Sequence, residues 1–208
     1  MEKKKKGLTL FSSLLCIGLI PMIVAAAVAM VIAGTKISDE LEEETYGKLK
    51  VAAEGLQMYY AYDIIKTGYA AYEHDYVDSL LGEDIELTLF VDDVRYITSL
   101  KDSNNPSGRN EGTKASEEIW AKVKNGEDYY ADNVSIGNGK YYVYYVPLKD
   151  GNGKVAGMAF AGTPENDVKS AINSAIMMLL VATIGLVSIL AVIIVILGRK
   201  IRKPFVTI

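Results

Sequence analysis

The sequence has little of the chemistry on which most catalytic and metal sites depend. Among its 208 residues there is one cysteine, Cys16, and one histidine, His74. A lone cysteine allows no disulfide and no cysteine-based metal site within one chain. A lone histidine excludes a two-histidine metal site. A catalytic pair of a nucleophile and a histidine would have to use His74 itself. We expect His74 to be a surface or packing residue. The chain is therefore predicted not to be an enzyme, with no catalytic residues, no metal and no cofactor.

Charge is absent from two long stretches of the sequence. Residues 8–34 carry no charged residue over 27 positions, and residues 170–198 carry none over 29. About 20 apolar helical residues cross the hydrocarbon core of a bilayer, so each stretch is long enough to span it. A secretory signal has a shorter apolar region, of roughly 7–15 residues. We therefore expect two transmembrane helices, the first of them an uncleaved anchor.

Basic residues flank both stretches on the side away from the middle of the chain. Residues 1–7 contain "EKKKK", and residues 199–208 begin with "RKIRK". Because an excess of Lys and Arg marks the cytoplasmic side of a span, both termini are expected in the cytoplasm and residues 35–169 outside. Residues 35–169 hold 14 basic and 25 acidic residues, a net charge of about −11. Such a surface argues against nucleic acid as a partner.

The first part of this outer region has the pattern of a helix. Apolar residues recur from Ile37 to Tyr59 at spacings of three, four or their multiples, with glutamates on the other faces. The pattern predicts one long helix that continues from the membrane to about Tyr62. A second, shorter helix is predicted over residues 69–81 and ends at Gly82.

The period then changes to that of strands. Residues 85–100 alternate and are rich in β-branched and aromatic residues, with Asp92 and Asp93 as the turn of a hairpin. Two more hairpins are predicted, with turns at 137–139 and 149–153, where glycines cluster between strand-like runs.

The remaining segments complete the expected architecture. Residues 101–113 are rich in Asn, Ser and Gly and predict a loop, whereas residues 114–126 predict a short helix. The last helix is expected to begin with Thr163 as its N-cap and Pro164 as its first residue. The predicted fold class is α+β: a long N-terminal helix and a five-stranded antiparallel sheet with a short inserted helix, flanked by two transmembrane helices.

Arg95 is a candidate for ligand binding in this acidic region. It shares a predicted strand face with Ser99. Its guanidinium either pairs with Asp92 or Asp93 at the surface, or anchors the carboxylate of a ligand, which arginine binds bidentately.

Arg109 is the second candidate and lies in the predicted loop. It either binds a ligand, neutralises Glu111 or caps the helix that is expected to start near Thr113. The sequence alone leaves these three roles open.

Tyrosine is concentrated in one part of the chain, since all 14 tyrosines lie within residues 35–169. In the run "YYVYY", Tyr141 and Tyr145 share one strand face, and Tyr142 and Tyr144 share the other. Either both faces are covered by packing, or one of them lines a small-molecule pocket, where aromatic walls are usual. The candidate ligand-binding residues are Arg95, Ser99, Arg109, Tyr129, Tyr142 and Tyr144.

Several segments together resemble a known sensor family. "YVDSLLGEDIELTLFVDDVRYITSL", "GRNEGTKAS" and "YYADNVSIGNGKYYVYYVPLKDGNGKVAGMAFAG" are similar to the single Cache sensor domain, PAS-like in fold, of bacterial methyl-accepting chemotaxis proteins and related sensor kinases. The resemblance covers about residues 35–165. Residues 198–205, "GRKIRKPF", resemble the opening of a HAMP linker, which carries a proline soon after the membrane; here that residue is Pro204.

The resemblance implies that a small molecule binds between the sheet and a covering loop and helix. Arg95 falls where members that bind citrate-like acids place an arginine on the ligand carboxylate. Here "TS" stands where those members have a histidine–proline pair, and tyrosines replace a basic residue on the strand that leads into "YYVPL". The resemblance therefore implies a small carboxylate or an amino acid as the ligand.

The resemblance also implies a signalling role at a bacterial plasma membrane. Ligand binding would shift the terminal helix relative to the first and pass the displacement to a HAMP module and an output domain. We expect a homodimer, and a cytoplasmic signalling domain or partner outside this chain, since the sequence ends ten residues past Gly198. A chemoreceptor is the principal prediction. The alternatives are the sensor part of a histidine kinase or nucleotide cyclase, and a ligand-free structural membrane protein.

Overall fold

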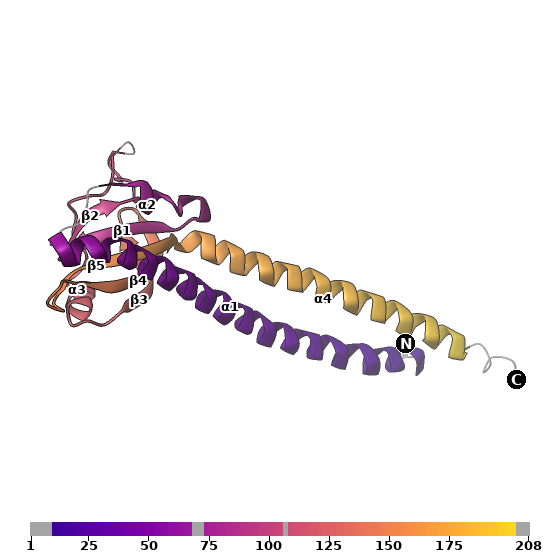
Figure 1. Ribbon diagram of the computed structural model, residues 1–208. Coiled ribbons are helices and arrows are strands. Elements are labelled where there is room, and N and C mark those ends of the chain that lie inside the picture. Colours follow the sequence, from indigo (N-terminus) through magenta and orange to yellow (C-terminus); the bar gives the residue numbers. More distant parts are fainter. Residues whose placement is uncertain (1–9, 68–72, 106–107, 203–208) are drawn as a thin grey trace, which may run out of the picture. The chain divides into compact units, whose positions relative to one another are not determined.

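The computed structural model describes residues 10–67, 73–105 and 108–202 (Figure 1). The chain divides into two units. One is the continuous stretch Glu40–Ala171, and the other combines Met1–Asp39 with Ile172–Ile208. The described residues of the second unit are helical. The basic N-terminus and Pro204, which carry part of the predicted topology, lie outside the described residues.

Two long helices contain the described residues of the uncharged stretches. Helix α1 covers Leu10–Thr67, and helix α4 covers Glu165–Arg202. Within them, Cys16–Ala61 and Glu165–Leu197 are long and apolar enough to cross a membrane, judged by length and composition. The prediction of one long helix is confirmed, and α1 continues five residues beyond the expected end at Tyr62.

The part of α1 within Glu40–Ala171 buries one face. Its completely or almost completely buried residues are Leu49, Ala53, Leu56 and Tyr60. Their spacing of three and four residues places them on a single stripe of the helix. Tyr59, which the sequence pattern placed on the apolar face, is instead 46% exposed.

The second predicted helix is much shorter than expected. Helix α2 covers Asp75–Asp78, and a turn of 3₁₀ helix, η1, covers Leu81–Glu83. The prediction of a continuous helix over 69–81 is wrong for its described part. The Ser79 hydroxyl donates a hydrogen bond to the carbonyl of Tyr76 (2.7 Å), and such local side-chain bonds compete with the helical pattern. Residues 68–72 lie outside the described part.

The five predicted strands form one antiparallel sheet in the order β2-β1-β5-β4-β3. The hairpin turn at Asp92–Asp93 and the two glycine-containing turns are confirmed. The α+β class with a five-stranded antiparallel sheet is therefore confirmed as well. The strands are β1 (Glu86–Val91), β2 (Val94–Thr98), β3 (Tyr129–Ile136), β4 (Gly139–Lys149) and β5 (Val155–Pro164).

The start of the last helix differs from the prediction. Thr163 and Pro164 still belong to β5, where they lie opposite Tyr142 and Tyr141 of β4. Helix α4 begins at Glu165. The assignment of Thr163 as N-cap and Pro164 as first helical residue is wrong, because strand pairing continues to Pro164 and leaves no connecting residue.

Helices cover both faces of the sheet. Helix α3 (Glu117–Lys124) is capped by the Ser116 hydroxyl, which accepts from the amide of Ile119. Its buried residues join one hydrophobic cluster with the sheet: Phe90, Leu100, Ile119, Val123, Ile136, Val143, Tyr145, Met158 and Phe160. On the opposite face, Tyr142 packs beside Tyr46 of α1, with ring centroids 5.6 Å apart.

Candidate functional site

A cavity of about 530 Å³ lies on the α3 face of the sheet. The segment 110–116, helix α3 and strand β3 contribute most of its walls, and Arg95 of β2 and Tyr145 of β4 complete it. Two smaller cavities, of about 280 and 420 Å³, have no buried charged side chain in their linings. The larger cavity does, because Arg95 is only 7% exposed.

Arg95 is a buried cation that contacts no carboxylate among the described residues. Its Nη1 donates to Oγ1 of Thr113 (2.6 Å), which in turn donates to the carbonyl of Asn110 (2.9 Å). Its guanidinium carbon lies 5.2 Å from the centre of the Phe90 ring. Its buried Nε has no hydrogen-bond acceptor in the described structure. Burial lowers the pKa of Arg95, although an arginine remains charged in proteins.

The surface pairing considered for Arg95 is wrong. Asp93 binds the ammonium of Lys114 (3.0 Å) instead, and Arg95 is buried whereas Asp92 is exposed. A buried charge is costly unless it is paired and hydrogen-bonded. An orphaned buried donor in a native structure therefore calls for a specific explanation.

Backbone hydrogen bonds attach the segment 110–116 to strand β2 at Arg95. The amide of Arg95 donates to the carbonyl of Thr113, and the amide of Gly112 donates to the carbonyl of Arg95, both at 2.8 Å. The amide of Ala115 donates to the carbonyl of Asp93 (2.9 Å). Gly112 has a φ of +73°, which glycine adopts without strain. The segment that forms the cavity wall is thus fixed to the strand that carries the cation.

Two tyrosines belong to the lining of the cavity. Tyr129 and Tyr145 lie opposite each other on β3 and β4, with ring centroids 6.1 Å apart. Burial raises the pKa of both phenols, and for Tyr145 the nearby charge of Arg95 opposes this effect. Both hydroxyls therefore stay protonated at neutral pH and are available as hydrogen-bond donors.

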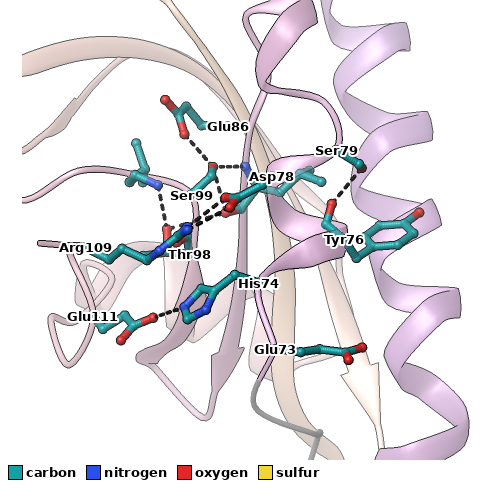
Figure 2. Close-up of polar contacts among 12 residues, drawn as sticks. Glu73, His74, Tyr76, Asp78, Ser79, Glu86, Thr98, Ser99, Arg109 and Glu111 are labelled. Atoms are coloured by element: carbon teal, nitrogen blue, oxygen red, sulfur yellow. Dashed lines mark hydrogen bonds and ion pairs between the residues drawn. The ribbon is translucent and has the colours of Figure 1, made fainter. Parts of the chain in front are cut away.

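Arg109 does not line this cavity. Its Nη1 and Nη2 donate to the two carboxylate oxygens of Asp78, at 2.8 and 2.7 Å. Its Nη1 also donates to the carbonyl of Thr98 (2.7 Å), as Figure 2 shows. This bond to Arg109 holds the pKa of Asp78 below its usual value. The idea that Arg109 caps the helix near Thr113 is wrong, because α3 begins at Glu117.

His74, expected to be a surface or packing residue, has a specific partner. Its Nε2 lies 2.8 Å from Oε1 of Glu111 (Figure 2). His74 precedes α2 and Glu111 lies in the same loop as Arg109, so two polar contacts join α2 to this loop.

The three other predicted residues also lie outside the cavity. The Ser99 hydroxyl donates to Glu86 and accepts from the amide of Leu87. On the α1 face, the Tyr142 hydroxyl donates to Glu42 (3.2 Å) and the Tyr144 hydroxyl donates to Asp128 (3.1 Å). Of the six candidates, the structure brings together Arg95 and Tyr129. It does not bring Ser99, Arg109, Tyr142 or Tyr144 to them.

Several cavity residues were missed by sequence reasoning. Tyr145 was assigned a strand face but no role, and the alternation of "YYVYY" already separates it from Tyr142 and Tyr144. Thr113 lies in the "GRNEGT" segment and directly follows the glycine that the loop requires. The sequence pattern of α3 predicts that Ile119 is buried, but it does not indicate that Ile119 lines a cavity.

The chain is similar in sequence to a known domain family and in structure to two solved domains. The family described as "Single cache domain 3" matches residues 69–175, just over half of the chain. The crystal structure of the Escherichia coli DcuS sensor domain is similar, with a TM-score of 0.46 and 18% identity over 66% of this chain and 98% of that one. The periplasmic domain of RsbU from Chlamydia trachomatis has a TM-score of 0.40 and 9% identity, over 74% and 58% of the two chains. No curated protein sequence matches the chain.

Proposed function

The chain belongs to the single cache domain 3 family, and on this premise we propose that it is the sensor part of a bacterial transmembrane chemoreceptor. The observation that carries the proposal is Arg95, a buried residue that lines a cavity of about 530 Å³ and contacts no carboxylate among the described residues. A small anionic molecule that enters the cavity supplies the missing charge. Its binding energy then depends on whether Arg95 is present.

The geometry of Arg95 favours a carboxylate over a neutral ligand. Nη1 of the guanidinium is occupied by Thr113, and the charge of this buried group is not matched by a carboxylate among the described residues. A guanidinium binds a carboxylate through two parallel N–H donors, and charge-assisted bonds of this kind are roughly twice as strong as neutral ones. Tyr129 and Tyr145 also line the cavity.

We further propose a two-pass topology in the bacterial plasma membrane. Residues 8–34 and 170–198 form the spans, residues 35–169 form the extracytoplasmic sensor, and residues 1–7 and 199–208 lie in the cytoplasm. The support is the presence of two helices that are long and apolar enough to cross a membrane, with the basic residues at the outer ends of the chain. Two such helices in each chain suit a homodimer, in which four helices pack together in the membrane.

The proposed signal is a displacement of α4 relative to α1 that reaches a cytoplasmic output domain. Strand β5 runs directly into α4 without a connecting residue, so a movement of the sheet is transmitted to the helix without a flexible joint. The resemblance of residues 198–205 to a HAMP opening supports an output domain joined through a HAMP module, which suits a chemoreceptor and a sensor kinase alike.

Binding is tested on the whole chain, purified in lipid nanodiscs. Trp120 is the single tryptophan and packs against the cluster that contains Ile119 and Tyr145, so its fluorescence reports the state of the sensor. We expect some small carboxylates to raise the melting temperature, since a ligand at 100 times its dissociation constant adds about 2.7 kcal/mol. If no small carboxylate or amino acid changes the melting curve, ligand sensing is the wrong proposal.

The output is tested in cells. Deletion of the gene should abolish swimming towards or away from a compound that binds the purified chain. Unchanged swimming, with an altered transcriptional or cyclic-nucleotide response to that compound, would instead support a sensor kinase or a cyclase.

A further inference from the structure

The contact between His74 and Glu111 changes in strength when a proton binds. Nε2 of His74 lies 2.8 Å from Oε1 of Glu111, and the two side chains are 25% and 26% exposed (Figure 2). With a neutral imidazole the contact is an ordinary hydrogen bond. With a protonated imidazole it is an ion pair, whose charge-assisted bond is roughly twice as strong. Histidine side chains commonly change their charge between pH 5 and 8.

The backbone on both sides of Glu111 is bonded to β2 or to the residues that follow it. The amide of Asn110 donates to the carbonyl of Leu100 (2.9 Å), and the amide of Gly112 donates to the carbonyl of Arg95 (2.8 Å). Asn110 and Arg95 both line the cavity of about 530 Å³. Glu111 therefore lies within the segment that forms the cavity wall, and a force on its side chain acts on that wall.

The backbone next to His74 is attached to α1. The carbonyl of Glu73 accepts from the hydroxyl of Tyr60 (3.2 Å). The hydroxyl of Tyr76 lies so close to Gly55 of α1 that a Cβ on this glycine would be 2.9 Å from it. The contact of His74 with the loop therefore links the cavity wall to α1 through the start of α2.

A second contact between α2 and the same loop keeps its charge over this pH range. Arg109 binds both carboxylate oxygens of Asp78, and this bond holds the pKa of Asp78 below its usual value. The connection between α2 and the loop thus consists of one pair that is charged throughout pH 5–8 and one pair whose charge is set by the proton on His74.

The charged groups around the two contacts include more acids than bases. From α1, the hydroxyls of Tyr59 and Tyr60 donate to the carboxylate and the carbonyl of Glu73. A positive charge on His74 is added where four carboxylates and two basic groups gather, so it draws the two segments together. These six groups are Glu73, Asp75, Asp78, Lys101, Arg109 and Glu111.

We propose that the chain also senses protons: protonation of His74 tightens its bond to Glu111 and ties the cavity wall more firmly to α2, and through α2 to α1. This inference adds a second input to the proposed function. It does not depend on the identity of the small-molecule ligand, because the contact is present in the ligand-free chain. The wall is expected to be held by two charged pairs at pH 5.5 and by one at pH 8.

The test measures hydrogen–deuterium exchange of the whole chain in lipid nanodiscs, without ligand, at pH 5.5 and pH 8. Exchange is corrected for its intrinsic dependence on pH. The amides of Asn110 and Gly112 report on the wall, because they are bonded to the carbonyls of Leu100 and Arg95. Since a bond to a charged group is stronger than a neutral one, we expect these amides to open about 5-fold less often at pH 5.5, or about 1 kcal/mol.

Two variants assign this difference to the pair. His74→Gln and Glu111→Gln each keep a hydrogen-bonding side chain and remove one of the two charges. The difference between pH 5.5 and pH 8 should disappear in both. It should persist in Glu127→Gln, a matched control at an exposed glutamate before β3. If the wild type shows no difference, or if either variant of the pair keeps it, the inference is overturned and the proposed binding of a small molecule is unaffected.

The wild type also allows a direct measurement, because His74 is the single histidine of the chain. A chain with isotope-labelled histidine, purified through a tag without histidine, gives one imidazole NMR signal. This signal should titrate between pH 5 and 8, with the same midpoint as the exchange of Asn110 and Gly112. A signal that does not change over this range, or a midpoint that differs from that of exchange, overturns the inference even if both variants fail to fold.

Discussion

Arg109 holds the carboxylate of Asp78 through both ends of its guanidinium, at 2.8 and 2.7 Å. The two residues are 31 positions apart, Arg109 in the loop that precedes the cavity wall and Asp78 at the end of α2. The same guanidinium donates to the carbonyl of Thr98 at the end of β2 (2.7 Å). The side chain of Arg109 thus connects its own loop to helix α2 and to the end of strand β2.

Helix α2 is also attached to α1. The hydroxyl of Tyr60 donates to the carbonyl of Glu73 (3.2 Å), and the rings of Tyr59 and Tyr76 are stacked with centroids 4.3 Å apart. In Figure 2, Tyr76 points towards the neighbouring helix, whereas Asp78 points towards the loop. A continuous set of contacts therefore leads from the cavity wall through α2 to the helix that is proposed to enter the membrane.

Asp78→Asn should make the sensor less stable at neutral pH and less sensitive to acid. Arg109 holds the folded-state pKa of Asp78 below the unfolded value, which is about 3.9 for an aspartate. The unfolded state therefore binds more protons between these two values, and stability rises with pH there. The stabilisation is fully present above about pH 4 and is lost as the pH falls through the folded pKa.

The measurement is the Trp120 melting temperature of wild type and Asp78→Asn from pH 7 to pH 3. The gap between the two proteins should narrow as the pH falls. Asp75→Asn, at an exposed position of the same helix, is the matched control and should change little at any pH. A gap that stays constant over this range would mean that the charge of Asp78 contributes nothing to stability.

Arg109→Ala should reduce stability without removing the ligand site. It leaves the Asp78 carboxylate and the Thr98 carbonyl without their donor, a loss of about 1–3 kcal/mol. The cavity lining does not include Arg109, so the affinity for a small carboxylate that binds the wild type should change by less than about 3-fold, or 0.7 kcal/mol, in the folded protein. Arg109→Lys should restore part of the stability, since lysine keeps the charge but not the planar fork.

Loss of ligand binding in Arg109→Ala would contradict this prediction. If Arg109→Ala abolishes the binding of that carboxylate while Lys101→Ala, an exposed control in the same loop, does not, then Arg109 contacts the ligand, which is one of the three roles that the sequence left open. Melting curves recorded on the same samples distinguish that result from unfolding.

Local patterns predicted most of the fold. The alternation of residues 85–100 and the glycines at the two later turns identify all five strands. Both signals depend only on residues that are neighbours in the sequence. The two errors concern the ends of segments, one of them set by a distant strand contact and the other by a local side-chain bond. Pro164 remains in β5 because Tyr141 of β4 pairs with it, and α2 is short because Ser79 bonds back to Tyr76.

The site was predictable only in part for the same reason. Arg95 and Tyr129 are in the cavity, but the strand alternation that placed Ser99 beside Arg95 does not hold. Strand β2 ends at Thr98, and the register with β1 shifts between Leu89 and Phe90. The pairing of Arg109 with Asp78 could not be predicted from the sequence, since nothing near Arg109 in the chain indicates Asp78.

Gly157→Ala should strongly destabilise the sheet next to the site. A Cβ at Gly157 would lie 2.0 Å from the carbonyl oxygen of Phe90, so β1 and β5 would have to separate. Overpacking of this kind typically costs about 1–3 kcal/mol and sometimes more. Gly82→Ala is the control, because a Cβ there meets nothing within 4 Å. Equal melting temperatures for both variants would show that the strands can separate freely at Gly157.

Arg95→Met provides the most direct test of why a buried cation is retained. Without ligand the substitution removes a charge that is desolvated and contacts no carboxylate among the described residues, at the loss of one hydrogen bond to Thr113. That bond contributes about 0.5–1.5 kcal/mol, and the desolvation of the unpaired donor has a similar or larger cost. The ligand-free variant should therefore melt no more than a few degrees below wild type, while the stabilisation by any small carboxylate that binds the wild type disappears. A variant that fails to fold without ligand would show instead that Arg95 is a structural residue, and that its burial needs no ligand to explain it.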